Sequence, residues 1–251
     1  MEIKICHLYP EVLNLYGDRG NILCMEERLR RRGIGVSTTF LGIGEKAEFG
    51  AFDIFFIGGG QDFEQEVLLD DLAGGKDREL RAAVEDGRSF LAICGGYQMM
   101  GHSYTTADGV RCEFLGAVDF ETVGAKERMI GNYVFRLGEH SGGSVVVGFE
   151  NHSGKTWLGK GVEPLGTVLF GHGNNGEDGT EGCRYRNVFG TYSHGPVLPK
   201  NPALCDTILL SALERKYGRA ELEPLPDRFE TLAHDSVLDR IMSGKIHGDH
   251  T

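Results

Sequence analysis

The stretch Ser89-Phe-Leu-Ala-Ile-Cys94-Gly-Gly-Tyr-Gln98 decides both the fold and the chemistry that this sequence predicts. Its apolar run, Phe90 to Ile93, predicts a buried strand, and the residues from Tyr97 onward predict the start of a helix. A strand that turns sharply into a helix exposes the residue at the corner, and hydrolases present a nucleophile in this way. The corner residue here is Cys94, and the helix N-terminus behind it favours the reactive thiolate. Because a buried cysteine before two glycines is also common as a purely structural residue, the other parts of a site must be sought elsewhere.

Strand and helix signals alternate on both sides of this stretch. Predicted strands lie at 3–8, 35–40, 52–57 and 89–93, and predicted helices lie at 18–32, 62–72 and 77–85. This alternation indicates an α/β fold, an open and mostly parallel sheet with flanking helices and right-handed crossovers. The run 52–57 is almost continuously apolar and is expected to be a central strand.

The rest of the chain is expected to complete the same single domain, residues 1–251. Between about 113 and 171 the strands look antiparallel, and we expect them to extend the same sheet as added β-hairpins. The glycine- and asparagine-rich segment 171–182 is expected to be a mobile surface loop. A late strand at 188–193, helices at 202–217 and 229–242 and a polar tail at 245–251 follow.

Composition excludes several classes of protein. The net charge of −11 argues against a binder of nucleic acids or anionic membranes, since these need a basic face. The six cysteines form no CxxC pair, so the common zinc and redox motifs are absent and no metal site is expected. Free thiols, a start that resembles a strand rather than a signal peptide and the absence of long apolar runs favour the cytoplasm.

A thiol nucleophile needs a base and an oxyanion hole, and two further segments offer them. His194 ends the predicted strand at 188–193, so it belongs to the same sheet edge as Cys94, where ligands collect in open α/β folds. Gly59 follows the strand at 52–57 and can direct a backbone N–H across the site toward Gly95. A hydrogen-bonded loop histidine and a plain glycine turn explain the same residues without catalysis. A phosphate-binding loop is disfavoured, because the Gly-Lys-Ser/Thr ending is missing.

Several motifs in one order carry a resemblance to a known family. The segments ICGGYQ (93–98), VGFENHSG (147–154) and FGTYSHGP (189–196) resemble class I glutamine amidotransferases of the cobyric acid synthase (CobB/CobQ-like) type. Within that family, LYPEVLNLYGDRGNI (8–22) and ERMIGNY (127–133) resemble the GatD branch, the glutaminase subunits of lipid II isoglutaminyl synthase. The resemblance covers about residues 1–215.

The resemblance implies a role for each matching residue. Cys94 is expected to attack the γ-carboxamide of glutamine, and His194 to act as the base and then protonate the departing ammonia. The expected substrate contacts are Gly59 and Gly95 as oxyanion donors, Gln98 and Arg128 on the glutamine, and Asn151 and His152 in the wall of the site. A guanidinium suits an α-carboxylate because it forms a bidentate pair, although Arg128 could equally be a solvated surface charge.

One position departs from the family. Most class I amidotransferases carry a glutamate two residues after the histidine, but here that residue is Pro196. The resemblance therefore implies a Cys–His dyad, which thiolate chemistry tolerates. Glu150 or a backbone carbonyl could take the place of the missing acid, and the sequence leaves that choice open.

The sequence shows no ATP-binding loop, so the resemblance implies a two-subunit enzyme without a cofactor in this chain. A Mur-ligase-like partner (MurT) is expected to use ATP and Mg to activate the D-glutamate α-carboxylate of lipid II, which ammonia converts to D-isoglutamine for peptidoglycan synthesis. The partner is expected beside the active-site edge, near 16–21 and 171–182. The alternatives are an amidotransferase of corrinoid synthesis, a stand-alone γ-glutamyl cysteine hydrolase and a non-catalytic scaffold.

Overall fold

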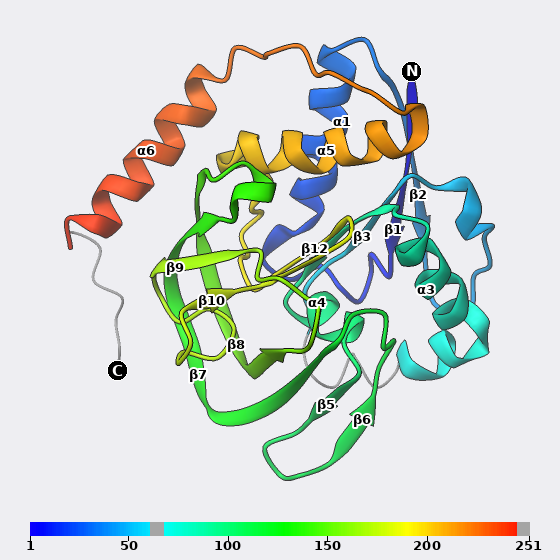
Figure 1. Ribbon diagram of the computed structural model, residues 1–251, viewed down its shortest axis with the longest axis vertical. Coiled ribbons are helices and arrows are strands. Elements are labelled where there is room, and N and C mark those ends of the chain that lie inside the picture. Colours follow the sequence, from blue (N-terminus) through cyan, green and yellow to red (C-terminus); the bar gives the residue numbers. More distant parts are fainter. Residues whose placement is uncertain (61–67, 245–251) are drawn as a thin grey trace.

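The computed structural model describes residues 1–60 and 68–244, and its main layer is a six-stranded sheet (Figure 1). All neighbouring strands in this sheet are parallel except the edge strand β11. In spatial order the strands are β11 (Cys183–Tyr185), β12 (Val188–Thr191), β4 (Ser89–Ile93), β3 (Ile54–Ile57), β1 (Glu2–Leu8) and β2 (Gly35–Leu41). The predicted fold class is confirmed. The expected central place of the third strand is also confirmed, since β3 and β4 are buried along their whole length.

Helices flank the sheet on both faces. The chain turns from β1 to β2 in one direction and from β3 to β4 in the other, so right-handed crossovers place α1 (Arg19–Arg31) and α3 (Asp77–Glu85) on opposite faces. In Figure 1, α5 (Pro202–Tyr217) lies beside α1. The predicted helix at 62–72 falls largely outside the described residues. Its described part, 68–71, is helical and runs into a π-helical turn, η3 (Leu72–Lys76).

The middle of the chain forms a second sheet, which corrects the expectation that its strands extend the first one. The order is β10 (Thr180–Glu181), β9 (Gly166–Phe170), β7 (Phe120–Leu137), β5 (Ser103–Thr105) and β6 (Arg111–Glu113), and β8 (Val145–Leu158) pairs with β7. Burial alternates along β8, so only one of its faces is covered. Such a strand cannot enter a sheet that helices cover on both faces, and it needs a layer of its own.

The glycine-rich segment 171–182 is a surface loop at 171 and 176–179, as predicted, but 173–175, 181 and 182 are buried. Asn174 and Asn175 are buried, and Asn174 Nδ2 donates to the carbonyl of Gly182 at 2.9 Å. Asn174 Oδ1 also accepts a hydrogen bond from the Tyr97 hydroxyl at 3.1 Å. Glycines with positive φ at 173, 176, 179 and 182 let the backbone turn tightly enough to direct these amides inward.

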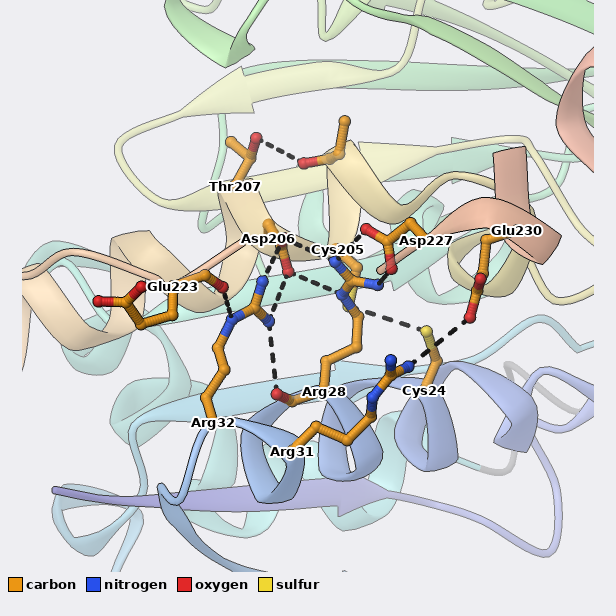
Figure 2. Close-up of polar contacts among 11 residues, drawn as sticks. Cys24, Arg28, Arg31, Arg32, Cys205, Asp206, Thr207, Glu223, Asp227 and Glu230 are labelled. Atoms are coloured by element: carbon orange, nitrogen blue, oxygen red, sulfur yellow. Dashed lines mark hydrogen bonds and ion pairs between the residues drawn. The ribbon is translucent and has the colours of Figure 1, made fainter. Parts of the chain in front are cut away.

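A buried arginine fastens the C-terminal region to α1. Figure 2 shows Arg28 between Asp206 of α5 and Asp227, which precedes α6 (Arg228–Met242). The guanidinium donates to both oxygens of each carboxylate at 2.7–2.9 Å, and its side chain is 4% exposed. Arg32 adds a further bond to Asp206 at 2.7 Å. Burial alone would raise the pKa of Asp206, but the bonds from Arg28 and Arg32 lower it overall.

The last helix, α6, ends the described chain and stands apart from the main layer in Figure 1. It contacts the second sheet through Ile241, which packs with Val134 and Val147. Within residues 1–60 and 68–244, no helix combines the length and apolarity that crossing a membrane requires.

Candidate active site

The site lies at the carboxyl edge of the main sheet, where four adjacent strands each deliver one group. β12 leads to His194, β4 to Cys94, β3 to Gly59 and β1, through the loop that follows it, to Asp18. The strands are parallel and in register, with Ile57 paired to both Leu8 and Ala92, so their ends meet at one place. This is the edge where open α/β sheets collect their functional groups.

Cys94 occupies the corner between β4 and α4 (Gly95–Met100). Its backbone has φ 46° and ψ −105°, a strained conformation for a residue with a Cβ, and its N–H donates to the carbonyl of Thr191 at 2.8 Å. A Cβ on Gly96 would lie 2.6 Å from the carbonyl oxygen of Ile57, so the helix can turn back over the sheet only with glycine there. The local geometry is that of the predicted nucleophile elbow.

His194 is buried beside Cys94, as the sequence predicts. Its backbone N–H donates to the carbonyl of Phe149 at 2.7 Å, a bridge that joins the two sheets at the site. Burial alone would lower the pKa of His194. The negative charge of Cys94, with further contacts to Asp18 and Cys94, instead raises that pKa to about 10. The imidazole is therefore held as a cation beside Cys94, in the protonation state that a leaving amine requires.

Asp18 is the acidic residue next to His194, and the sequence analysis missed it as a site residue. Its Oδ2 lies 3.5 Å from Nδ1 of His194, and the side chain is fully buried. Asp18 is the N-cap residue of α1, but its side chain makes no capping hydrogen bond. Asp18 could have been identified from its position after the first predicted strand, because that strand ends at the same carboxyl edge as those of Cys94 and His194.

Glu150, one of the two substitutes considered for the missing acid, contacts residues other than His194. It accepts hydrogen bonds from the backbone of His172 at 2.7 Å and of Gly173 at 3.1 Å, and lies 3.6 Å from His152 Nε2. Burial alone would raise the pKa of Glu150, but the nearby His152 and the hydrogen bonds from His172 lower it. The buried histidine next to Glu150 is therefore His152, and the acidic residue next to His194 is Asp18.

The predicted oxyanion donors lie on either side of the thiol, after β3 and after β4. Gly95 directly follows Cys94 as the first residue of α4. The N–H of Gly59 donates to Oδ2 of Asp18 at 2.9 Å, so in this structure that amide is bonded to a carboxylate. The structure thus brings both glycines to the site, and their role as oxyanion donors stays a prediction.

Arg128 lies at the rim of the site and is linked through Asn151 to Tyr16. Its Nε donates to Oδ1 of Asn151 at 2.9 Å, and the amide nitrogen of Asn151 donates to the hydroxyl of Tyr16. Tyr16 has a positive φ of 55°, and its ring lies 5.0 Å from that of His194. A chain of polar contacts therefore joins the predicted carboxylate clamp to an exposed tyrosine that packs against the base.

Gln98 and His152 form the inner wall behind the nucleophile. The side-chain amide of Gln98 donates to the Tyr192 hydroxyl at 3.2 Å, and the His152 ring stacks on Tyr192 at 3.6 Å. His152 Nδ1 also lies 2.8 Å from the carbonyl oxygen of Gly154. Both residues are buried, and this packing favours the wall role expected for His152; contact between Gln98 and glutamine stays a prediction.

The assembled groups suit the cleavage of an amide through a thioester. The thiolate can add to a carboxamide carbon, and the imidazolium can give its proton to the departing amine. Among residues 1–60 and 68–244, no cluster of His, Cys, Asp and Glu side chains could hold a metal ion.

Comparisons with known proteins agree with this chemistry. The model of the CobB/CobQ-like glutamine amidotransferase domain matches residues 4–202. The GatD subunit of lipid II isoglutaminyl synthase (glutamine-hydrolyzing) from Staphylococcus aureus is 42% identical over 95% of this chain and 96% of its own. The subunit of the same name from Streptococcus pneumoniae is 39% identical over 87% of this chain and 83% of its own.

A chain in the solved structure of PurLQS from Thermotoga maritima shares the fold, with a TM-score of 0.58 at 15% identity over 85% of this chain and 99% of that one. The domain match spans the elbow, the histidine strand and the loop that carries Asp18, so it covers every part of the site described above. On these grounds the chain belongs to the CobB/CobQ-like glutamine amidotransferase family.

Proposed function

We propose that this protein is the glutaminase subunit of a lipid II isoglutaminyl synthase. The observation that carries the proposal is the strained Cys94 elbow beside a cationic His194, in a chain similar over nearly its whole length to subunits of that name. Glutamine is the substrate, and glutamate and ammonia are the products.

The reaction follows from the groups in place. The Cys94 thiolate adds to the γ-carboxamide carbon of glutamine, and backbone amides stabilise the oxyanion. His194 donates its proton to the nitrogen, the C–N bond breaks, ammonia leaves and a glutamyl thioester remains. His194, now neutral, takes a proton from water, the resulting hydroxide attacks the thioester, and glutamate leaves as the thiolate reforms.

A second subunit would use the ammonia. We propose a Mur-ligase-like partner (MurT) that holds ATP and Mg, activates the D-glutamate α-carboxylate of lipid II and yields D-isoglutamine for the cell wall. Five cysteines, Cys6, Cys24, Cys94, Cys183 and Cys205, are free thiols, which fits a reaction in the reducing cytoplasm. The exposed Tyr16 side, next to the rim of the site, is the place where we expect the partner to approach.

Titration with the partner tests the assignment. Glutamate release by this chain alone should be slow and should rise on adding MurT, with a complex visible by size-exclusion chromatography. An unchanged rate and no complex would leave a stand-alone hydrolase and remove the lipid II assignment.

Cys94→Ser tests the chemistry separately. It should abolish glutamine-dependent amidation by the complex, while ammonium chloride still supports amidation, because the partner's site is untouched. Cys112→Ser, a change in the outer strand β6, is the matched control and should behave like the wild type. Substantial glutaminase activity in Cys94→Ser would place the nucleophile elsewhere.

A further inference from the structure

We infer that Asp18 is a positioning residue of this site: its Oδ2 orients His194 through Nδ1 and at the same time holds the loop that carries Gly59. The role rests on the proposed glutaminase function, because only a reaction at Cys94 needs an oriented imidazole. Asp18 lies outside the position, occupied here by Pro196, at which the family resemblance places an acidic residue.

The contacts of the carboxylate support this role. Oδ2 lies 3.5 Å from His194 Nδ1 and accepts the Gly59 N–H at 2.9 Å, so one oxygen faces both the base and the oxyanion loop. Oδ1 is buried and has no hydrogen-bond partner among the described residues. A buried carboxylate is costly to keep unless it interacts with a cation, and His194 is the cation within ion-pair distance of Asp18.

Neighbouring contacts determine where Asp18 sits. Gly20 packs so closely on Pro196 that a Cβ there would lie 2.5 Å from Pro196 Cγ. Asn21 Oδ1 accepts the N–H of Leu198 at 2.9 Å. The start of α1 is therefore clamped to the loop after His194, and Pro196 helps to bring an acid from another part of the chain to the imidazole.

Contact with Asp18 has two effects on His194: it fixes the tautomer of the imidazole and stabilises its protonated form. When Nδ1 of His194 is engaged by Asp18, Nε2 is the nitrogen left to exchange a proton with Cys94 and with the leaving ammonia. His194 is faced by Cys94, by Asp18 and by the buried His152, whose own pKa is lowered by burial, and Cys94 and Asp18 supply the negative charge in contact with His194. Removing the Asp18 charge should therefore destabilise the protonated form of His194 without preventing glutamine from binding.

Asp18→Asn is the central test, with Asp53→Asn as its matched control. Asp53 is also buried and accepts a backbone N–H, from Lys4 at 2.8 Å, but it precedes β3 at the opposite edge of the sheet. In the complex with the partner, Asp18→Asn should lower kcat by about 10- to 1000-fold and leave the KM for glutamine within about threefold of the wild type. Iodoacetamide alkylation of Cys94 at pH 7, followed on its peptide by mass spectrometry, should slow by about tenfold.

The two readouts separate the possible outcomes. A folded Asp18→Asn protein with wild-type kcat and alkylation rate would overturn the inference, even if its melting temperature fell as much as that of Asp53→Asn. If the wild type itself hydrolysed no glutamine, the proposed function would fail, while the alkylation rates would still report whether Asp18 supports the Cys94–His194 pair.

A second experiment needs no folded Asp18 variant. In Cys94→Ser, which lacks the thiolate, ¹³C-labelled histidine allows the pKa of His194 to be followed by NMR, with His194→Gln to assign the signal. The carboxylate of Asp18 should keep that pKa above the ordinary histidine value of about 6.5. A value at or below the ordinary one would show that Asp18 does not hold the imidazole.

Discussion

Gly59→Ala should disable the site through a single added methyl group. The Cβ of an alanine at 59 would lie 2.5 Å from Cε1 of His194 and 3.2 Å from Oδ2 of Asp18. The backbone itself accepts alanine, because Gly59 is not among the residues with positive φ. The substitution also keeps the N–H of residue 59, so any loss of activity reports displacement of the base rather than removal of an oxyanion donor.

The expected size of the effect follows from the overlap. Carbon atoms in contact sit about 3.5–4.0 Å apart, so the imidazole must retreat by roughly 1 Å. A misplacement of about 1 Å at a reacting group costs on the order of 100-fold in rate. Crowding of this kind also destabilises a protein by about 1–3 kcal/mol.

The assay is kcat/KM for glutamine hydrolysis in the complex with the partner, together with the melting temperature of this subunit. Gly50→Ala is the control, because a Cβ there meets no atom within 4 Å and its φ is not positive. A folded Gly59→Ala protein with kcat/KM within about threefold of the wild type would refute the placement of His194 against Gly59.

Three further predictions concern the clamp, a buried acid and the C-terminal anchor. Arg128→Ala should lower kcat/KM for glutamine by about 30- to 1000-fold and Arg128→Lys should restore part of it, because an ammonium cannot form the planar pair; a wild-type glutamine dependence in Arg128→Ala would remove this residue from the site. Glu181 is fully buried and desolvation raises its pKa to about 7, so its ionisation penalises folding as pH rises from about 4.5 to about 7. Glu181→Gln should therefore raise the free energy of unfolding by about 1–3 kcal/mol at pH 8 and by much less at pH 4, and equal shifts at both would contradict this. Arg28→Leu should lower the urea midpoint, with a loss of about 2–4 kcal/mol in the free energy of unfolding, because it leaves the carboxylates of Asp206 and Asp227, 28% and 21% exposed, without their buried cation. An unchanged midpoint would mean that solvent compensates for the lost guanidinium.

Local patterns in the sequence were sufficient for the elements of the main sheet. Apolar runs and glycine stops predict α1, β2, α3 and β4 to within a residue or so, because burial and helix termination depend on neighbours close in the chain. The same patterns indicated antiparallel strands in the middle of the chain but not the length of β7 and β8, where polar residues interrupt long strands that are held by their partner across the second sheet. They also missed the buried part of 171–182, since a segment rich in Asn and Gly is typical of a surface loop unless tertiary packing turns its amides inward.

For the site, the sequence by itself determined which cysteine and which histidine come together. Cys94 and His194 each end a predicted strand, and parallel strands bring their carboxyl ends to one edge, so topology alone predicts their meeting. Only the tertiary structure decided that Asp18 lies against His194 and that Glu150 lies next to His152. It also decided that the Gly59 amide is hydrogen-bonded to the carboxylate of Asp18. These choices depend on distances of a few ångströms between side chains that are far apart in the chain. Contacts such as Gly20 with Pro196 set those distances, and no periodicity or spacing in the sequence records them.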